Sequence, residues 1–188
     1  MTRRRLLEAF ARHRGGATTM EFILLFPVLA IMMFAAIDLG NVMYTRLRLS
    51  TTIAAGASYV TTRSADVSNT NAGDLAMSTA NIVGNANGTD WARAKVTVNN
   101  GPEALKNTGN SSLTNSTTPG TTNGLCYCPT SNSNFGAAAT CGTICGTGGV
   151  AGRWVRIAAQ RRVWRLWSTY GLLAEGQYMT KIAMVQTE

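Results

Sequence analysis

The sequence predicts an α+β fold, in which a long N-terminal helix, first transmembrane and then amphipathic, precedes a small antiparallel β-sheet domain with a disulfide-bearing loop. Three observations support this prediction. An uninterrupted apolar run extends from Phe22 to Ile37, apolar residues then recur every three or four positions, and later stretches alternate polar with apolar residues. With 188 residues, the chain has room for one modest domain and its appendages.

Residues 1–16 form a basic leader. Five of the 17 basic residues lie in the first 14 positions, so that with Glu8 subtracted the leader carries +4 of the net charge of +8. A basic cluster beside an apolar segment is typical of a cytoplasmic flank. Charged residues make up 14% of the chain, which favours a membrane-anchored or exported protein over an ordinary soluble one.

Residues 17–38 are predicted to span a membrane, with the N-terminus inside and the C-terminus outside. As a helix, Phe22–Ile37 reaches about 24 Å, and adding Ala17–Met20 gives about 31 Å, close to the thickness of a hydrocarbon core. A cleaved signal peptide has a shorter apolar core, and a buried core helix is not apolar on every side. Pro27 inside this run favours a kink, which membrane helices tolerate.

Residues 39–63 are predicted to continue the helix as an amphipathic stem. Polar residues such as Thr45 and Arg48 are assigned to other faces than the apolar ones. The apolar positions of the stem are Leu39, Val42, Met43, Leu47, Ile53, Ala54, Ala57 and Val60.

Glu21 immediately precedes the apolar run. It could be an acid of the first helical turn, favoured by the positive end of the helix dipole. That explanation leaves Gly16 unexplained, because a glycine between a charged leader and a membrane helix fits closely in a protease cleft. Cutting after Gly16 would give a mature chain that begins at Ala17.

The spacing from Gly16 to Glu21–Phe22, followed by an apolar helix, resembles the cleavage motif of type IVb prepilins. Residues 15–60 resemble, more narrowly, the TadE family of pilin-like proteins, in which this start recurs with a proline in the anchor, an acid-x-glycine at its end and a stem of small residues. The corresponding positions here are Gly16, Glu21, Phe22, Pro27, Asp38–Gly40 and Ala54–Ala57.

The resemblance implies a pseudopilin or minor-pilin-like component of a tight-adherence pilus in the bacterial cytoplasmic (inner) membrane. It implies a prepilin peptidase that cuts after Gly16, and a Glu21 that then meets the new N-terminal amine of its own chain or of a neighbouring subunit. A carboxylate and an ammonium in a low-dielectric layer offset each other's desolvation. Asp38 is interpreted as an interfacial acid, with a helix-packing role beside Gly40 as the alternative.

Residues 64–188 are predicted to form an extracytoplasmic α+β domain. A polar loop over about 100–150, rich in Asn, Ser, Thr and Gly, is assigned no regular elements. The other expected elements are a helix over Asp74–Val83, a strand over Trp91–Asn99, a turn at Asn100–Gly101, a strand pair over Arg153–Trp167 and a final strand over Gln177–Thr187.

Four cysteines lie in this loop, at Cys126, Cys128, Cys141 and Cys145. The C-x-C half departs from the usual knuckle spacing of zinc sites, and an extracytoplasmic location preserves disulfides. We therefore expect two disulfides and no metal. Three connectivities are possible, and cross-pairing of the two halves is favoured because a Cys126–Cys128 bond would be strained.

Arginines and tryptophans interleave in the segment 153–167, which is one signature of a nucleic-acid surface. A strand with outward arginines explains the same pattern, and the predicted compartment favours anionic headgroups or partner proteins over nucleic acid. The function of this segment is left open.

The sequence predicts no enzyme and no cofactor. Its sole histidine, His13, lies in the leader, so no Ser-His-acid arrangement is expected outside the membrane. The first hypothesis is a single-pass pilin-like protein whose partners are the lipid bilayer, a prepilin peptidase and other pilin-like subunits. The alternative is an extracytoplasmic binding module or adhesin on an uncleaved signal anchor.

Overall fold

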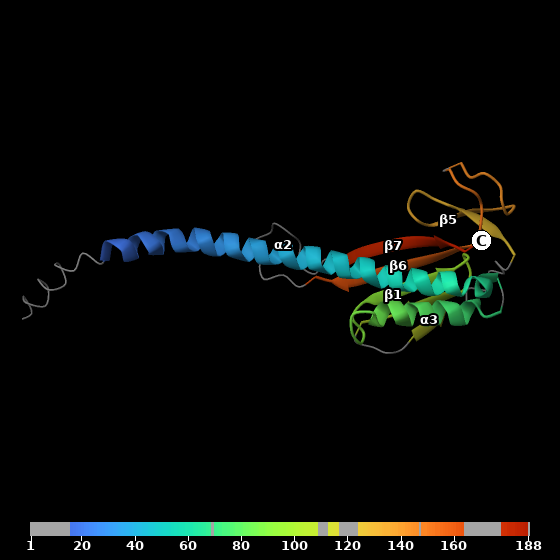
Figure 1. Ribbon diagram of the computed structural model, residues 1–188, viewed down its shortest axis with the longest axis horizontal. Helices are drawn as coiled ribbons and strands as arrows, with labels where there is room; N and C mark the ends of the chain where they lie inside the picture. Colours follow the sequence, from blue (N-terminus) through green and yellow to red (C-terminus); the bar gives the residue numbers. More distant parts are fainter. Residues whose placement is uncertain are drawn as a thin grey trace, which may run out of the picture. The chain divides into compact units, whose positions relative to one another are not determined.

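The computed structural model describes residues 16–68, 70–108, 113–116, 124–146, 148–163 and 178–187. These residues fall into two units, of which the first contains the helical residues up to Val42 and the second begins at Met43. The described part forms the expected α+β fold, with a long helix at its N-terminal end followed by antiparallel sheets (Figure 1). The basic leader, apart from Gly16, lies outside the described residues.

Helix α2 extends without interruption from Gly16 to Thr62, and the short 3-10 helix η1 (Ser64–Ser68) follows it. Its C-terminal part buries one face, whose members are Thr45, Leu49, Thr52, Ile53, Gly56 and Val60. Ile53 and Val60 were expected there. The expected inward positions of Leu39, Met43 and Leu47 are wrong, because all three side chains are exposed, and Thr45 is buried instead.

The physical reason is that this helix carries apolar or small residues on more than one side, so that spacing alone does not select the face. The hydroxyl of buried Thr52 is satisfied within the helix. The hydroxyl of Thr52 donates to the carbonyl of Leu49 at 2.8 Å, within the same helix. That bond satisfies the hydroxyl donor, so a threonine can be buried in a helix. A prediction that places every polar residue on the exposed face therefore fails here.

Helix α3 (Ala72–Asn85) includes the predicted helix Asp74–Val83 and extends it by two residues at each end. Its buried side chains include Leu75, Ala76, Ala80 and Val83. Their spacing of one, three and four residues defines one helical face, which packs on the sheet.

The main sheet has five antiparallel strands in the order β3-β2-β1-β6-β7, and α3 lies along β1 (Figure 1). Valines and isoleucines face each other across the ladder, with Val96 opposite Ile157 and Val155 opposite Val185. The alternation predicted for Trp91–Asn99 and for the last segment is confirmed. The strands are β1 (Arg93–Val98), β2 (Glu103–Lys106), β3 (Leu113–Ser116), β6 (Trp154–Arg162) and β7 (Tyr178–Gln186).

One hydrophobic core joins the buried faces of α2, α3 and the sheet. Gly56 of α2 is part of it: a Cβ atom at this position would lie 2.4 Å from Cγ2 of Val83 and 3.5 Å from Cδ1 of Ile157. Glycine therefore lets α2 approach α3 and β6 within the second unit. A larger residue could not do so without moving its neighbours.

The turn between β1 and β2 contains the positive-φ residues Asn99 (44°) and Asn100 (57°). Gly101 closes it by donating its amide to the carbonyl of Val98 at 2.8 Å. Positive φ at both central residues is the geometry of the tight hairpin turn that matches strand twist, and asparagine tolerates it well. The turn predicted at Asn100–Gly101 is thus present, one residue earlier.

Among the described residues of 100–150, where the sequence predicted no regular elements, there are four short strands. Two of them, β2 and β3, extend the main sheet, whereas β4 (Cys126–Pro129) and β5 (Phe135–Ala139) pair with each other. Each of these strands has only four or five residues. Such short strands do not show a clear period of two in a sequence rich in small polar residues. We call residues 124–152, which include β4 and β5, the insert.

The insert is held by two disulfides, which join Cys126 to Cys141 and Cys128 to Cys145. Each bond connects one half of the cysteine set to the other, as the favoured cross-pairing requires. The insert is also tied to the sheet: the indole Nε1 of Trp154 donates to the carbonyl of Tyr127 at 3.0 Å, and the side-chain Nδ2 of Asn99 donates to the carbonyl of Leu125 at 3.0 Å.

Candidate functional site

The N-terminal half of α2 is the first candidate site, because it exposes apolar side chains on every side. Phe22, Ile23, Leu24 and Leu25 are successive residues, about 100° apart around the helix, and each is more than half exposed. The helix is long and apolar enough to cross a membrane, by length and composition. A contiguous exposed apolar surface of this kind is typical of a segment that contacts lipid or other helices.

The predicted processing residues lie at the beginning of this helix. Gly16 is the first described residue of α2, and Ala17 follows it. Glu21 is exposed, and no described residue forms an ion pair with it. Phe22 is exposed as well, and its ring lies 5.8 Å from that of Phe26, one turn later.

The predicted helix-packing residues differ in their surroundings. Pro27 lies inside the continuous helix, and Asp38 is half-buried. A Cβ atom added at Gly40 would meet no described atom within 4 Å. Contacts within the described chain therefore do not require a glycine at position 40.

The arginine-rich segment 153–167 is partly described, because Trp164 to Trp167 lie outside the described residues. Two of its arginines serve the fold. Arg156 donates from Nε to the carbonyl of Ser133 at 2.9 Å, which fixes the insert, and Arg161 donates to the carbonyl of Trp91 while its guanidinium lies 4.4 Å from the centre of the Trp91 ring. Arginines committed to carbonyls and an aromatic face have fewer donors left for phosphates.

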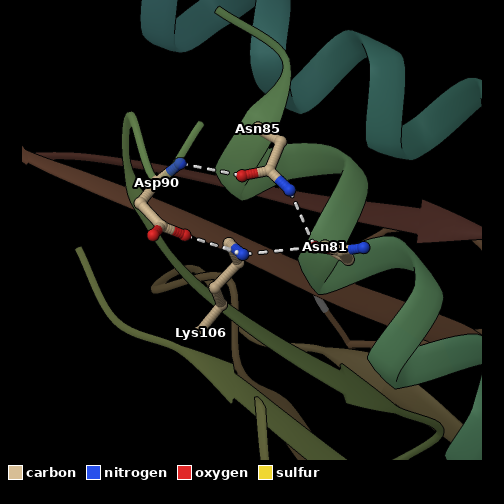
Figure 2. A network of polar contacts seen from close by, with 4 residues as sticks. All are labelled: Asn81, Asn85, Asp90 and Lys106. Carbon is tan, nitrogen blue, oxygen red and sulfur yellow. Dashed lines mark hydrogen bonds and ion pairs between the residues drawn. The ribbon is translucent and has the colours of Figure 1, made fainter. Parts of the chain in front are cut away.

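A second cluster, which the sequence did not suggest, surrounds Lys106 of β2. Its side chain is 3% exposed, and its Nζ atom lies 2.9 Å from Oδ1 of Asp90 and 3.2 Å from Oδ1 of Asn81 (Figure 2). Lys106 stands on the same face of β2 as buried Ala104. The sequence signal for this burial is a lysine two positions after an alanine that faces the core. A strand of four residues is too short for that alternation to predict a buried lysine.

Gly56 was missed for a related reason. It lies among the small residues Ala54–Ala57 that the family resemblance pointed to, yet its contacts with Val83 and Ile157 depend on segments distant in the sequence. As for metals, the described residues contain no group of three or more His, Cys, Asp or Glu side chains that could hold an ion.

Comparison with known proteins relates part of α2 to a protein family. Residues 16–58 match the family model described as TadE-like protein. The match begins at Gly16, ends at Ser58 inside α2, and does not reach the sheet. No curated protein and no solved structure matches the chain.

Proposed function

We propose that this chain, whose residues 16–58 are TadE-like, is a single-pass pilin-like membrane component of a tight-adherence pilus machine. The proposal rests on one observation: the family match covers the exposed apolar helix. The match begins at Gly16, the glycine where processing is expected. The TadE-like segment relates the chain to tight-adherence pili. A pseudopilin or minor-pilin role in assembly is the finer proposal.

In this proposal a prepilin peptidase in the bacterial cytoplasmic membrane removes residues 1–16. The scissile Gly16–Ala17 bond lies at the beginning of the described part of α2, immediately before the apolar segment. A glycine before the bond lets the opened backbone enter a narrow cleft. These features support cleavage at this bond.

Glu21 is then the partner of the new N-terminal ammonium. Ala17 and Glu21 are four residues apart on a helix, so the ammonium and the carboxylate lie on the same side of α2. The same carboxylate, being exposed, is also accessible to the ammonium of a neighbouring subunit. In a low-dielectric layer either pairing stabilises both charges, and pairing between subunits would fix the axial register of packed helices.

Exposed apolar side chains support helix packing as the mode of action. Beyond Asp38, α2 still exposes Met43 and Leu47, which are one turn apart and lie on the side of the helix away from the core of the second unit. Helices of other pilin-like subunits would cover such positions and remove them from water.

N-terminal sequencing of the full chain, produced together with a prepilin peptidase, tests this function. We expect the mature protein to begin at Ala17, and Gly16→Val to block the cut because a branched side chain obstructs the cleft. Gly15→Val is the matched control and should be cut normally. A wild-type chain that begins at Met1 or Thr2 would contradict the proposal and favour a plain signal anchor.

The insert favours a second candidate, a tethered binding module. It contains no charged residue between Gly124 and Gly152, is held by two disulfides, and exposes Ile144 to 83%. A rigid uncharged surface with an exposed aliphatic side chain suits contact with a partner outside the cell. Deleting the insert would abolish binding in this case and leave processing at Gly16 intact.

A further inference from the structure

The cluster around Lys106 brings an amine, an amide and a carboxylate together. The side chains of Lys106 and Asp90 are 3% and 15% exposed, whereas Asn81 is exposed to solvent. Lys106 reaches it along Gly84 of α3, where an added Cβ atom would lie 2.4 Å from Cδ of the lysine. With glycine at position 84, the Nζ atom lies beside Asp90 and Asn81 (Figure 2). A Cβ atom there would force the lysine side chain to move. This cluster lies in the second unit and has no part in the function proposed for α2.

Asn85 fixes the orientation of the amide. Its Nδ2 donates to Oδ1 of Asn81 at 2.8 Å, while its own Oδ1 accepts the backbone amide of Asp90 at 2.8 Å. The carbonyl oxygen of Asn81 thus receives two donors, Nδ2 of Asn85 and Nζ of Lys106. Two donors polarise the carbonyl and leave its carbon electrophilic, close to the only amine of the cluster.

We propose that Lys106 and Asn81 become joined by an isopeptide bond that the cluster itself forms. Asp90 takes a proton from the Lys106 ammonium, and the neutral amine attacks Cγ of Asn81. Nδ2 of Asn85 stabilises the negative charge that develops on Oδ1.

Asp90 then protonates the amide nitrogen of Asn81, and the bond from this nitrogen to Cγ breaks. Asp90 also removes the second proton from the attacking nitrogen and passes it to the departing ammonia. The balance is one ammonium side chain and one primary amide giving one secondary amide and one ammonium ion, without an oxidant, a reductant or a cofactor.

Position favours this reaction. The fold holds Nζ of Lys106 within 3.2 Å of Oδ1 of Asn81 and within 2.9 Å of Oδ1 of Asp90, which takes the place of a bimolecular encounter. Asn81 is exposed to solvent, which gives the ammonia an exit. The product would tie α3 covalently to β2, two elements that otherwise meet through non-covalent contacts in this part of the core.

Peptide mapping of the full chain, purified from membranes in detergent, tests the bond. After reduction, alkylation and trypsin digestion, residues 64–93 should be linked to residues 96–153, because trypsin does not cut after an acylated Lys106. The linked mass should be about 17 Da below the sum of the two peptides, the loss of one ammonia. A free peptide 96–106 as the main product overturns the proposal, and a loss of about 18 Da, one water, assigns the bond to Asp90 instead and overturns the role of Asn81.

Variants separate the roles of Lys106, Asn81 and Asp90. Lys106→Arg and Asn81→Ser should each abolish the linked peptide, and Asp90→Asn should abolish it while both reacting groups remain. Full linkage in Asp90→Asn would overturn the acid–base role. Lys95→Arg is the matched control: it alters an exposed lysine paired with Glu103 at 2.8 Å and should leave the linkage unchanged. The wild-type digest decides the question even if a variant fails to fold, and failure here leaves the function proposed for α2 untouched.

Discussion

Gly56 offers a direct test of how α2 joins the second unit. In Gly56→Ala the new methyl group would lie 2.4 Å from Cγ2 of Val83, whereas carbon atoms in contact are normally about 3.5–4.0 Å apart. Val83 is fully buried, and a valine in a helix has one strongly preferred rotamer. The side chain therefore cannot turn away, and either α3 or the core must shift.

The net effect is the difference between two contributions. Overpacking of a well-filled core costs about 1–3 kcal/mol, and replacing glycine by alanine inside a helix returns about 0.5–1 kcal/mol. We expect Gly56→Ala to lower the free energy of unfolding by about 1 kcal/mol, which corresponds to a fall in Tm of about 2–4 °C for a domain of this size.

Thermal unfolding of the detergent-solubilised chain, followed by tryptophan fluorescence, measures the change. Gly40→Ala is the matched control in the same helix, because its methyl group would meet no described atom within 4 Å, and it should leave Tm unchanged or slightly raised. In Gly56→Ala/Val83→Ala the clash is relieved, so the double variant should be less destabilised than the sum of the single ones. Equal shifts of Tm for Gly56→Ala and Gly40→Ala would refute the close-packing argument.

Two further predictions concern the beginning of α2 and the insert. Glu21→Gln keeps the shape of the side chain and removes its charge, so we expect it to reduce co-purification with other pilus components at least tenfold, about 1.4 kcal/mol. The control Asp74→Asn alters an exposed acid of α3 and should have no effect. Unchanged co-purification of Glu21→Gln would count against the ion pair. Cys126→Ser/Cys141→Ser removes a bond between residues 15 apart in sequence and should destabilise the insert by about 2–3 kcal/mol. Limited proteolysis should then cut within residues 124–152 and spare β1, β6 and β7, and unaltered resistance of the insert would contradict this.

Some parts of the fold could be predicted because their signals are local. Val96 and Val98 alternate with Lys95 and Thr97 along β1, and a period of two identifies a half-buried strand without knowledge of its neighbours. Likewise, Phe22–Ile37 has no polar interruption, so its length and composition alone indicate a membrane anchor.

Other parts were hidden because their signals are not local. The face that α2 turns to the core depends on α3 and β6, and the positions expected to be buried, such as Leu47, are exposed while Thr45 is buried. The short strands β4 and β5 carry no long period, and they are held by disulfides and by contacts with Trp154 and Arg156. Arginines that looked available to a polyanion turned out to bind backbone carbonyls.

The sequence by itself therefore determined the anchor, the glycine and glutamate at its beginning, and the class of domain that follows. These features depend on the order and spacing of neighbouring residues, which the chain carries before it folds. Only the tertiary structure decided that Gly56 allows α2 to meet α3, and that Lys106, Asp90, Asn81 and Asn85 form one cluster. Such contacts join residues far apart in the chain, and no local pattern encodes which of them will meet.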